Sequence, residues 1–329
     1  MKQMKVKLED VCERGTSNLK QSDIAKTSGD YPIYGASGYI GNTNFYHQEK
    51  PYVAVVKDGA GVGRAALYPA NSSVIGTMQY LLPKDNVLPK YLFYVVSYMH
   101  LEKYFTGATI PHIYFKDYKN EEFNLDLLER QAEIVEILEK CEKIIEKRKQ
   151  EIQLLDQLIK ARFVEMFGNP VLNDKGWEQK SLGEITTKIG SGATPKGGKE
   201  AYQEEGITLI RSMNVHNGQF EYKDLAHISD EQASKLDNVT IEEDDVLLNI
   251  TGASVARSCV VPNEILPARV NQHVCIIRCK DCIIPEFLNK LLIDDNYQDL
   301  LWSIAGSGAT RESITKQQVE NLQIILPML

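Results

Sequence analysis

The sequence predicts an α+β protein in which two homologous β-rich domains are joined by one long coiled-coil helix. Three observations support this fold class: a glycine-containing motif occurs twice, short strand-like runs flank each copy, and an apolar heptad pattern lies between them. The length of 329 residues suits two domains that each bury a core of their own. We predict domains at residues 1–123, 124–168 and 169–329.

The duplicated motif reads DGAGVGRAALYP at residues 58–69 and TGASVARSCVVP at residues 251–262, an offset of 193 residues. A second match, GAT at residues 107–109 and again at 308–310, has an offset of 201 that continues to the last residue. A similarity of this length indicates a duplicated domain rather than a short-period repeat.

Each copy of the motif is predicted to be a β-hairpin. A β-rich run, PYVAVVKDG or DDVLLNITG, leads into the glycines, and RAALYP or RSCVVP follows as the return strand. The glycines between the strands suit turns that need positive φ. The alternative is a phosphate-binding loop, but neither GxGxxG nor GxxxxGKS/T occurs and no helix is expected to follow.

Residues 126–168 are predicted to form the long helix. Asp126 is the expected N-cap, and Glu129, three residues later, is its expected capping-box partner. Gly168, followed by Asn169 and Pro170, is expected to end the helix. At 1.5 Å per residue such a helix is about 60 Å long. It therefore needs a partner helix, unless it lies along its own domains. Steps of four and three residues predict the helix interface as Ile134, Leu138, Cys141, Ile145, Ile152, Leu155, Ile159 and Met166.

Over essentially its full length the chain resembles the specificity (S) subunit of Type I restriction–modification enzymes. The matching segments are VAVVKDGAGVGR, VIGTMQYLLPK and TGATIPHIYFKDYK in the first copy, and GITLIRSMNV, DVLLNITGASVAR, VNQHV and SGSGATRESIT in the second. Residues 127–170 resemble that family's central conserved region.

The resemblance implies a protein without catalytic chemistry of its own. Each copy is then a target recognition domain for one half of a bipartite, asymmetric double-stranded DNA site. The resemblance also implies that the helix fixes the spacing between the two half-sites and docks modification (M) subunits. These subunits use S-adenosylmethionine to methylate adenine at N6. Restriction (R) subunits join the complex for ATP-driven cleavage. S-adenosylmethionine, ATP and Mg are therefore expected in partner subunits, and no cofactor is expected in this chain. In agreement, the sequence holds no Asn/Asp-Pro-Pro-Tyr/Phe motif and no Walker lysine loop.

Composition favours a cytoplasmic protein without a membrane segment, and the resemblance implies a role in phage defence. No apolar run reaches the ~18–20 residues of a membrane span. The N-terminal MKQMKVKLED is too polar for a secretion signal, and six scattered cysteines suit a reducing compartment. Two other functions stay open: a fused-domain DNA methyltransferase or nuclease fragment, which needs a further catalytic segment, and a coiled-coil scaffold with two protein-binding domains.

Net charge is −8, and because residues 1–168 sum to zero, the acidic balance falls on residues 169–329. A chain of this charge is expected to rely on partner subunits for much of its phosphate neutralisation when it binds DNA.

Candidate DNA contacts are the polar, aromatic and basic residues around the two motifs, because Arg, Lys, Asn and Gln read base edges and lysines mainly position phosphates. In the first copy they are Tyr34, Ser37, Tyr39, Asn42, Asn44, Lys57, Arg64, His112 and Lys116. In the second they are Lys196, Lys199, Arg211, Asn214, His216, Arg257, Asn271 and Arg311. For each of them a structural or solvated role is the alternative.

Two further sets of residues have a structural interpretation. Gln79 and Gln272 share the 193-residue offset, so we expect both in the common scaffold. The segment CIIRCKDC, together with His273, raises the question of a zinc site. Its spacing is not a paired CxxC and the first copy has no cysteine there, so no metal is expected.

The 201-residue offset maps Leu128, in the first turn of the central helix, onto the final Leu329. The resemblance implies a distal conserved helix that lies against the central one, and we expect this distal helix to be absent. We therefore predict a homodimer in which two central helices pair antiparallel. Arg148 and Arg162 lie in the seam, where a neighbouring Glu142 or Glu151 is expected to offset them.

Overall fold

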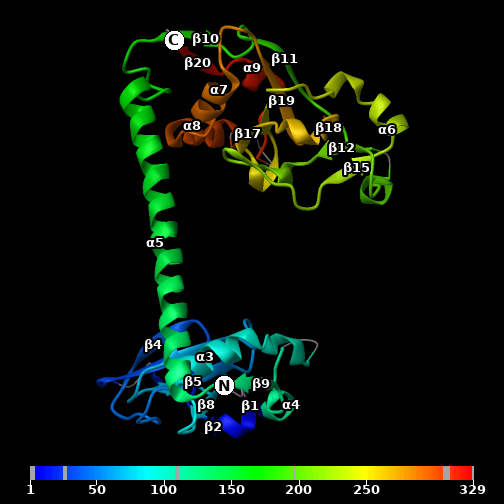
Figure 1. Ribbon diagram of the computed structural model, residues 1–329. Helices are drawn as coiled ribbons and strands as arrows, with labels where there is room; N and C mark the ends of the chain where they lie inside the picture. Colours follow the sequence, from blue (N-terminus) through cyan, green and yellow to red (C-terminus); the bar gives the residue numbers. More distant parts are fainter. Residues whose placement is uncertain (1–3, 25–27, 108–110, 196, 307–311, 328–329) are drawn as a thin grey trace. The chain divides into compact units, whose positions relative to one another are not determined.

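The computed structural model describes residues 4–24, 28–107, 111–195, 197–306 and 312–327. The chain forms two compact units, Met1–Glu151 and Ile152–Leu329, and helix α5 (Leu128–Phe167) runs from the first unit into the second (Figure 1). Both units combine short strands with helices, which confirms the predicted α+β class.

Before α5, the elements of the first unit follow one another in this order: β1 (Met4–Lys7), α1 (Leu8–Val11), β2 (Cys12–Thr16), α2 (Gln21–Ile24), β3 (Tyr31–Gly35), β4 (Gly38–Thr43), β5 (Tyr52–Val56), β6 (Ala65–Tyr68), β7 (Ser73–Val74), β8 (Met78–Pro83), α3 (Pro89–Tyr98), the 3-10 helix η1 (Leu101–Tyr104), α4 (Phe115–Tyr118) and β9 (Glu122–Leu125). Strands β2, β8, β5 and β6 form an antiparallel sheet in that order. A second sheet has the order β4-β3-β7, in which β3 and β7 are parallel.

Strand β5 is buried on both faces, which explains its continuous apolar sequence. Val53 and Val55 face a core that α3 covers, whereas Tyr52 and Ala54 face a second core together with Tyr80. This alternation follows from the two-residue period of a strand. The four-stranded sheet is therefore the middle layer of the unit.

After α5, the second unit contains β10 (Glu178–Ser181), β11 (Thr186–Ser191), η2 (Gly198–Ala201), β12 (Ile207–Ile210), η3 (Ser212–Asn214), β13 (Val215–His216), β14 (Gln219–Phe220), β15 (Ala226–Ile228), α6 (Asp230–Ser234), η4 (Asp237–Val239), β16 (Val246–Asn249), η5 (Gly252–Ser254), β17 (Ser258–Val260), η6 (Asn263–Ile265), β18 (Ala268–Val270), β19 (Val274–Cys279), α7 (Pro285–Leu292), α8 (Asp295–Gly306), α9 (Lys316–Glu320) and β20 (Gln323–Leu326).

The second unit repeats the topology of the first. Its four-stranded sheet has the order β11-β19-β16-β17, and its three-stranded sheet β15-β12-β18 again contains one parallel pair, β12 and β18. Val246 and Leu248 face a core formed with α7 and α8, while Leu247 and Ile276 face the core shared with β12 and β18. The duplication inferred from the sequence is present in the fold.

Strand register corrects one detail of the sequence alignment. Val55 pairs with Gln79 in the first unit, whereas Leu248, 193 residues further on, pairs with Cys275 in the second. Gln79 is therefore equivalent to Cys275, and the expected equivalence with Gln272 is wrong. Gln79 is buried and donates to a backbone carbonyl of β2, whereas Gln272 is exposed.

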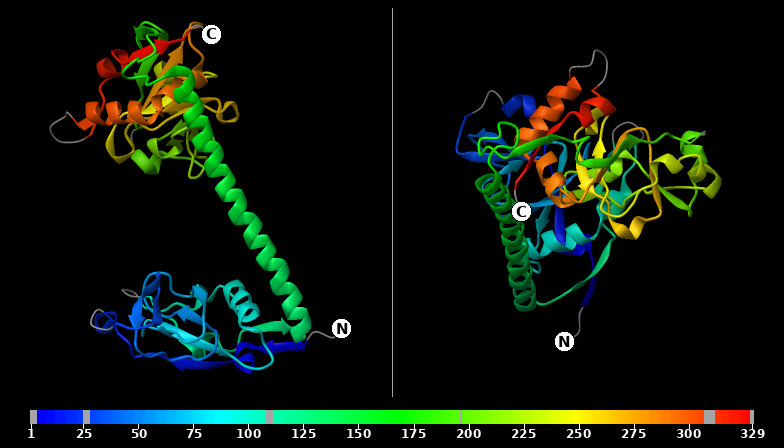
Figure 2. Two further views of the ribbon diagram at one scale, coloured as in Figure 1. Left: turned by 90° about the vertical axis from the view of Figure 1, so that its left-hand side faces the viewer. Right: turned by 90° about the horizontal axis from the view of Figure 1, so that it is seen from above.

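Helix α5 is one uninterrupted helix of 40 residues (Figure 2). Gln131, which is fully buried, holds its first turn to the first unit. The side-chain amide of Gln131 donates to the carbonyls of Asn86 at 2.9 Å and Asp126 at 2.8 Å, and accepts from the Leu88 N–H at 2.8 Å. The helix ends before Gly168, whose φ of +75° gives the predicted stop.

The predicted helix interface of α5 is exposed along most of its length. Ile134 and Leu138 are half-buried, and Ile134 packs against the core of the first unit. Cys141, Ile145, Ile152, Leu155, Ile159 and Met166 are exposed. The heptad pattern missed further exposed aliphatic residues of the same helix, among them Ile137, Ile144, Leu154 and Leu158.

The two arginines of the predicted seam are paired within α5 itself. Arg148 and Arg162 form ion pairs with Glu151 and Glu165, each three residues further along the same helix. Glu142 accepts a hydrogen bond from a tyrosine of α3 at 2.8 Å. Within the described chain, none of the helices combines the length and the low polarity that crossing a membrane requires.

Candidate nucleic-acid interface

A hairpin loop, which we call the glycine loop, occurs at residues 57–64 between β5 and β6 and at residues 250–257 between β16 and β17. The same backbone hydrogen bonds recur in both copies. From donor to carbonyl they are Val56–Arg64, Gly63–Val56, Val62–Gly59 and Arg64–Gly61 in the first unit, and Asn249–Arg257, Ala256–Asn249, Val255–Gly252 and Arg257–Ser254 in the second. Gly63 and Ala256 both have positive φ, +87° and +71°. The repeat therefore extends to individual hydrogen bonds.

A segment far along the chain closes each glycine loop. In the first unit the Gly59 N–H donates to the Pro111 carbonyl at 2.9 Å, and the Ile113 N–H donates to the Lys57 carbonyl at 2.9 Å. This contact brings the candidates Lys57 and His112 to the same end of the sheet. The second unit has the corresponding hydrogen bonds, Gly252 to Glu312 at 2.9 Å and Ile314 to Ile250 at 2.8 Å.

The β3–β4 hairpin gathers another group of candidates in the first unit. The Tyr34 ring stacks on Tyr68 with 4.2 Å between centroids and meets Tyr39 edge-on at 6.2 Å. Burial raises the pKa of Tyr34, so its hydroxyl stays protonated near neutral pH. Tyr39 is 62% exposed, and its hydroxyl donates to Asn42 at 3.1 Å. Ser37 lies in the exposed turn of the hairpin.

Four other candidates of the first unit lie at or near its surface. Asn44 is exposed, and Lys57 is half-buried in an ion pair with Asp58. The His112 ring meets Tyr114 edge-on at 5.1 Å, and the exposed Lys116 lies 5.3 Å from the centre of the same tyrosine ring.

In the second unit the glycine loop lines a shallow hollow of about 320 Å³. The candidate Arg257 lies in it, together with Met213, Thr251 and His273. Thr251 and His273 hydrogen-bond to each other through Oγ1 and Nδ1. Ser212, Gly252, Ala253 and Ser254 complete the lining.

Two candidates of the second unit are buried and maintain turns. Asn214 is fully buried, and its amide donates to the Glu221 carbonyl at 3.0 Å and accepts from the Arg211 N–H at 3.1 Å. Asn271 is 5% exposed and accepts from the His273 N–H at 3.0 Å. The geometry therefore gives these two amides a structural role.

Arg211 and His216 lie nearer the surface. The Arg211 guanidinium donates to the Asp224 carbonyl and lies 5.4 Å from the centre of the Tyr202 ring. His216 is half-buried on β13. Three other candidates lie outside the described part: Lys196 and Arg311 altogether, and Lys199 with respect to its side chain.

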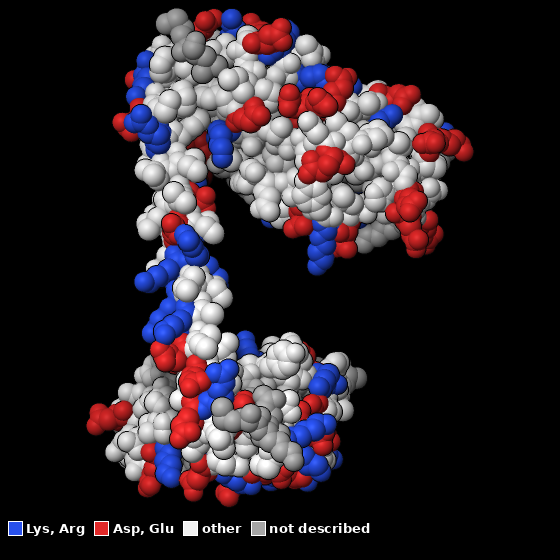
Figure 3. Space-filling model, in the orientation of Figure 1, with Lys and Arg blue, Asp and Glu red and all other residues white. Residues whose placement is uncertain are grey.

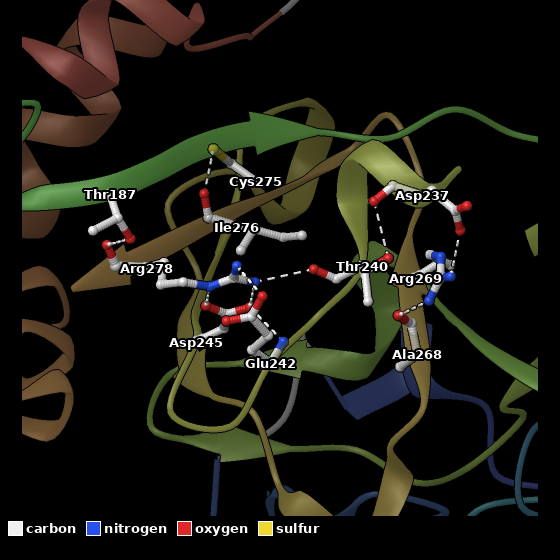
Figure 4. A network of polar contacts seen from close by, with 10 residues as sticks. All are labelled: Thr187, Asp237, Thr240, Glu242, Asp245, Ala268, Arg269, Cys275, Ile276 and Arg278. Atoms are coloured by element: carbon white, nitrogen blue, oxygen red, sulfur yellow. Dashed lines mark hydrogen bonds and ion pairs between the residues drawn. The ribbon is translucent and has the colours of Figure 1, made fainter. Parts of the chain in front are cut away.

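A network of polar contacts within the second unit has a structural role (Figure 4). Asp245, which is fully buried, accepts from Nε and Nη2 of Arg278 at 2.8 Å each. The pKa of Arg278 is raised, mainly by its hydrogen bond to Asp245. Arg269 donates to the Asp237 carboxylate at 2.8 Å and to the Ala268 carbonyl at 3.1 Å.

Sequence reasoning did not single out several exposed aromatic residues of the first unit. Tyr98 is 83% exposed, Phe105 is 58% exposed and Tyr114 is 50% exposed. They are isolated within apolar or mixed segments, so no local pattern marks them as surface residues. In the view of Figure 3, acidic side chains gather on the second unit and basic ones on the middle of α5.

The cysteines considered as metal ligands occupy different environments. Cys275 is buried in β19, where desolvation raises the pKa of its thiol to about 12. Cys279 is half-buried at the end of the strand, and Cys282 is exposed on the loop that follows.

Comparisons with known proteins agree with the duplicated fold. The family model for the Type I restriction modification DNA specificity domain matches residues 1–155 and again residues 174–329. The Type I restriction enzyme MjaIX specificity subunit of Methanocaldococcus jannaschii is 26% identical over 270 residues. That match covers 75% of this chain, and the chain spans 60% of the length of that relative.

Solved structures show the same fold. A crystal structure of the Type I restriction–modification system S subunit from M. genitalium matches with a TM-score of 0.57 and 16% identity, over 99% of this chain and 85% of that one. A structure that describes complex assembly and conformational transition of the type I R-M system matches with a TM-score of 0.55 and 17% identity, over 99% and 86%. The chain therefore belongs to the Type I restriction modification DNA specificity domain family, the non-catalytic specificity component of Type I restriction–modification systems.

Proposed function

We propose that the chain is the DNA specificity subunit of a Type I restriction–modification enzyme, and that each unit reads one half of a bipartite, asymmetric DNA site. The observation that carries this proposal is the pair of glycine loops. Their backbone hydrogen bonds are the same, yet the residues around them differ. A common scaffold with different surface residues suits one chain that reads two different half-sites.

The candidate residues divide into two kinds of DNA contact. Lys57 and Lys116, at the loop end of the first unit, suit phosphate contacts, which fix position without reading sequence. Tyr39, Asn42 and Arg257 suit contacts to base edges or base faces. The proposed division into recognition domains at residues 1–123 and 169–329, with a conserved helical region at 124–168, assigns both kinds of contact to the recognition domains.

Helix α5 is proposed to dock the modification subunits, which methylate adenine at N6 with S-adenosylmethionine. Restriction subunits join for ATP- and Mg-dependent cleavage, so this cytoplasmic chain needs no cofactor of its own. Support comes from the helix surface: the seam residues from Cys141 to Met166 are exposed, and so are Ile144 and Leu158 beside the seam. An apolar surface this wide suits more than one packing partner.

We further propose that one of these partners is the α5 helix of a second copy, paired antiparallel. The seam of exposed aliphatic residues supports this, because knobs-into-holes packing of two such helices removes them from water. Arg148 and Arg162 already have ion-pair partners on their own helix, so they enter such an interface as neutralised pairs.

Methylome sequencing of cells that express this chain with its modification subunit tests the proposed function. We expect methylated adenines within one asymmetric motif made of two specific halves separated by a fixed gap. Methylation that lacks any such motif contradicts the proposal, and methyl transfer by the isolated chain supports the fused-enzyme alternative instead.

A further inference from the structure

Arg64 and Arg257 occupy equivalent positions at the end of the two glycine loops, but their side chains have different surroundings. The Arg64 guanidinium donates to the Ala36 carbonyl in the turn of the β3–β4 hairpin. Among the residues that the structure describes, none forms a hydrogen bond or ion pair with the guanidinium of Arg257, which is half-buried.

The first cause of this difference is a competing amide. The Tyr34 carbonyl in the first unit and the Ile210 carbonyl in the second each accept a main-chain hydrogen bond at 3.0 Å. These two residues are therefore equivalent, and Ala36 corresponds to Ser212, each two residues further along its chain segment. In the second unit the Ser212 carbonyl accepts from the side-chain amide of Asn249 at 2.8 Å. The residue equivalent to Asn249 in the first unit is Val56, which has no donor to offer in its side chain.

The second cause is steric. Arg64 folds back over Gly61, and its guanidinium carbon lies 3.2 Å from the position that a Cβ on this glycine would take. The residue at the equivalent position of the second unit is Ser254, which carries a side chain where Gly61 has none. Because 3.2 Å is tighter than an ordinary van der Waals contact, a side chain at this position disfavours the folded-back conformation that Arg64 adopts over a glycine.

The hollow around Arg257 has the chemistry of a recognition site. Among the described residues that line the hollow, Arg257 is the only Lys or Arg, and Thr251 and His273 hydrogen-bond to each other. Met213, which is 43% exposed, supplies an apolar wall. In the first unit the hollow of about 310 Å³ beside the glycine loop is lined by Arg64 and also by the carboxylate-bearing Glu102. An acidic group there disfavours a polyanion.

We infer that Arg257, and not its equivalent Arg64, reads a base in the half-site of the second unit, through two adjacent acceptors such as O6 and N7 of guanine. The inference rests on the proposed function of the chain in DNA recognition. A free guanidinium presents two parallel N–H groups, which match such a pair of acceptors. The partly enclosed, part-apolar hollow distinguishes this site from an exposed phosphate contact. Arg64 instead stabilises the hairpin turn.

The test compares Arg257→Ala, Arg257→Lys and the matched control Arg64→Ala in the chain assembled with its modification subunits. Each assembly selects from random DNA, and the enriched motif is sequenced. For Arg257→Ala we expect the preference at one base position to fall about 5- to 150-fold, while the other half-site is unchanged. Arg257→Lys keeps the charge without the planar fork, so an intermediate loss is expected. Arg64→Ala leaves the motif as it is.

Folding of the Arg257 variants is checked by tryptophan fluorescence, because both tryptophans, Trp177 and Trp302, lie in the second unit. If the alanine variant unfolds, Arg257→Gln takes its place. Equal weakening on all sequences, with the log–log salt slope reduced by about 0.9, identifies a phosphate contact and overturns the inference. An unchanged motif also overturns it. Failure of the unmodified assembly to select any bipartite motif contradicts the proposed function instead.

Discussion

At the scale of single residues, four arginines of the second unit show that neighbours decide what a side chain does. Arg278 and Arg269 hold acidic partners, Arg211 holds a turn, and only Arg257 lies free in a hollow of the described structure. From the sequence alone, each arginine is a candidate DNA contact, and an arginine that holds an acidic partner or a turn cannot be distinguished from one that is free. The partners of Arg278 and Arg269 lie more than 30 residues away along the chain, where no local pattern points to them.

The ion pair of Arg278 with Asp245 gives the prediction at this scale. Asp245→Asn removes the buried negative charge and leaves the guanidinium with the exposed carboxylate of Glu242 as its remaining ion-pair partner in the described structure. We expect the second unit to lose about 3–5 kcal/mol of unfolding free energy. Urea unfolding followed by tryptophan fluorescence measures this, because both tryptophans report on that unit.

Glu242→Gln is the matched control for Asp245→Asn, because Glu242 contacts the same arginine from the surface, with 61% of its side chain exposed. Its expected cost is about 0–1 kcal/mol, as for other exposed pairs. Equal losses for the two variants contradict the assignment of the network's stability to the buried carboxylate.

At the scale of elements, the sequence predicts α5 well and its attachment poorly. The predicted bounds of 126–168 differ from Leu128–Phe167 by two residues and one residue, because heptads and a terminal glycine are local signals. The attachment depends on Gln131, whose partners Asn86 and Leu88 are more than 40 residues earlier. A glutamine on a charged helix gives no sign that it is buried.

The exposed seam of α5 carries the prediction at this scale. Ile145→Asp combined with Ile152→Asp places two charges in the proposed helix interface, where burial without a partner is unfavourable. We expect light scattering to show the mass falling from dimer to monomer, with both units still folded by circular dichroism.

Gln150→Asp combined with Gln157→Asp is the control for the seam variant. It adds the same charge on the opposite side of the helix, at positions that are also exposed, and is expected to leave the dimer intact. An unmodified chain that is a monomer at micromolar concentration, with its helix folded, contradicts the proposed pairing.

At the scale of the whole molecule, the sequence revealed the duplication because glycine and proline mark both hairpins at one offset. It did not reveal the three extra residues before β19, which shift the pairing partner of Leu248 to Cys275. It also gave no sign that Asn249 replaces Arg64 as the donor to the hairpin carbonyl. Such substitutions exchange one hydrogen-bond donor for another across space and leave the sequence pattern of the loop unchanged.

The two units have separate cores, and this leads to the last prediction. The buried clusters that contain Val53 and Tyr52 belong to the first unit, and those that contain Val246 and Leu247 belong to the second. Exchanging residues 1–123 for those of another family member is therefore expected to change one half of the methylated motif and to leave the other half intact. Exchanging residues 169–329 gives the complementary result. Methylome sequencing of both chimaeras decides the matter: if one exchange alters both halves, the reading of each half-site by a separate unit is contradicted.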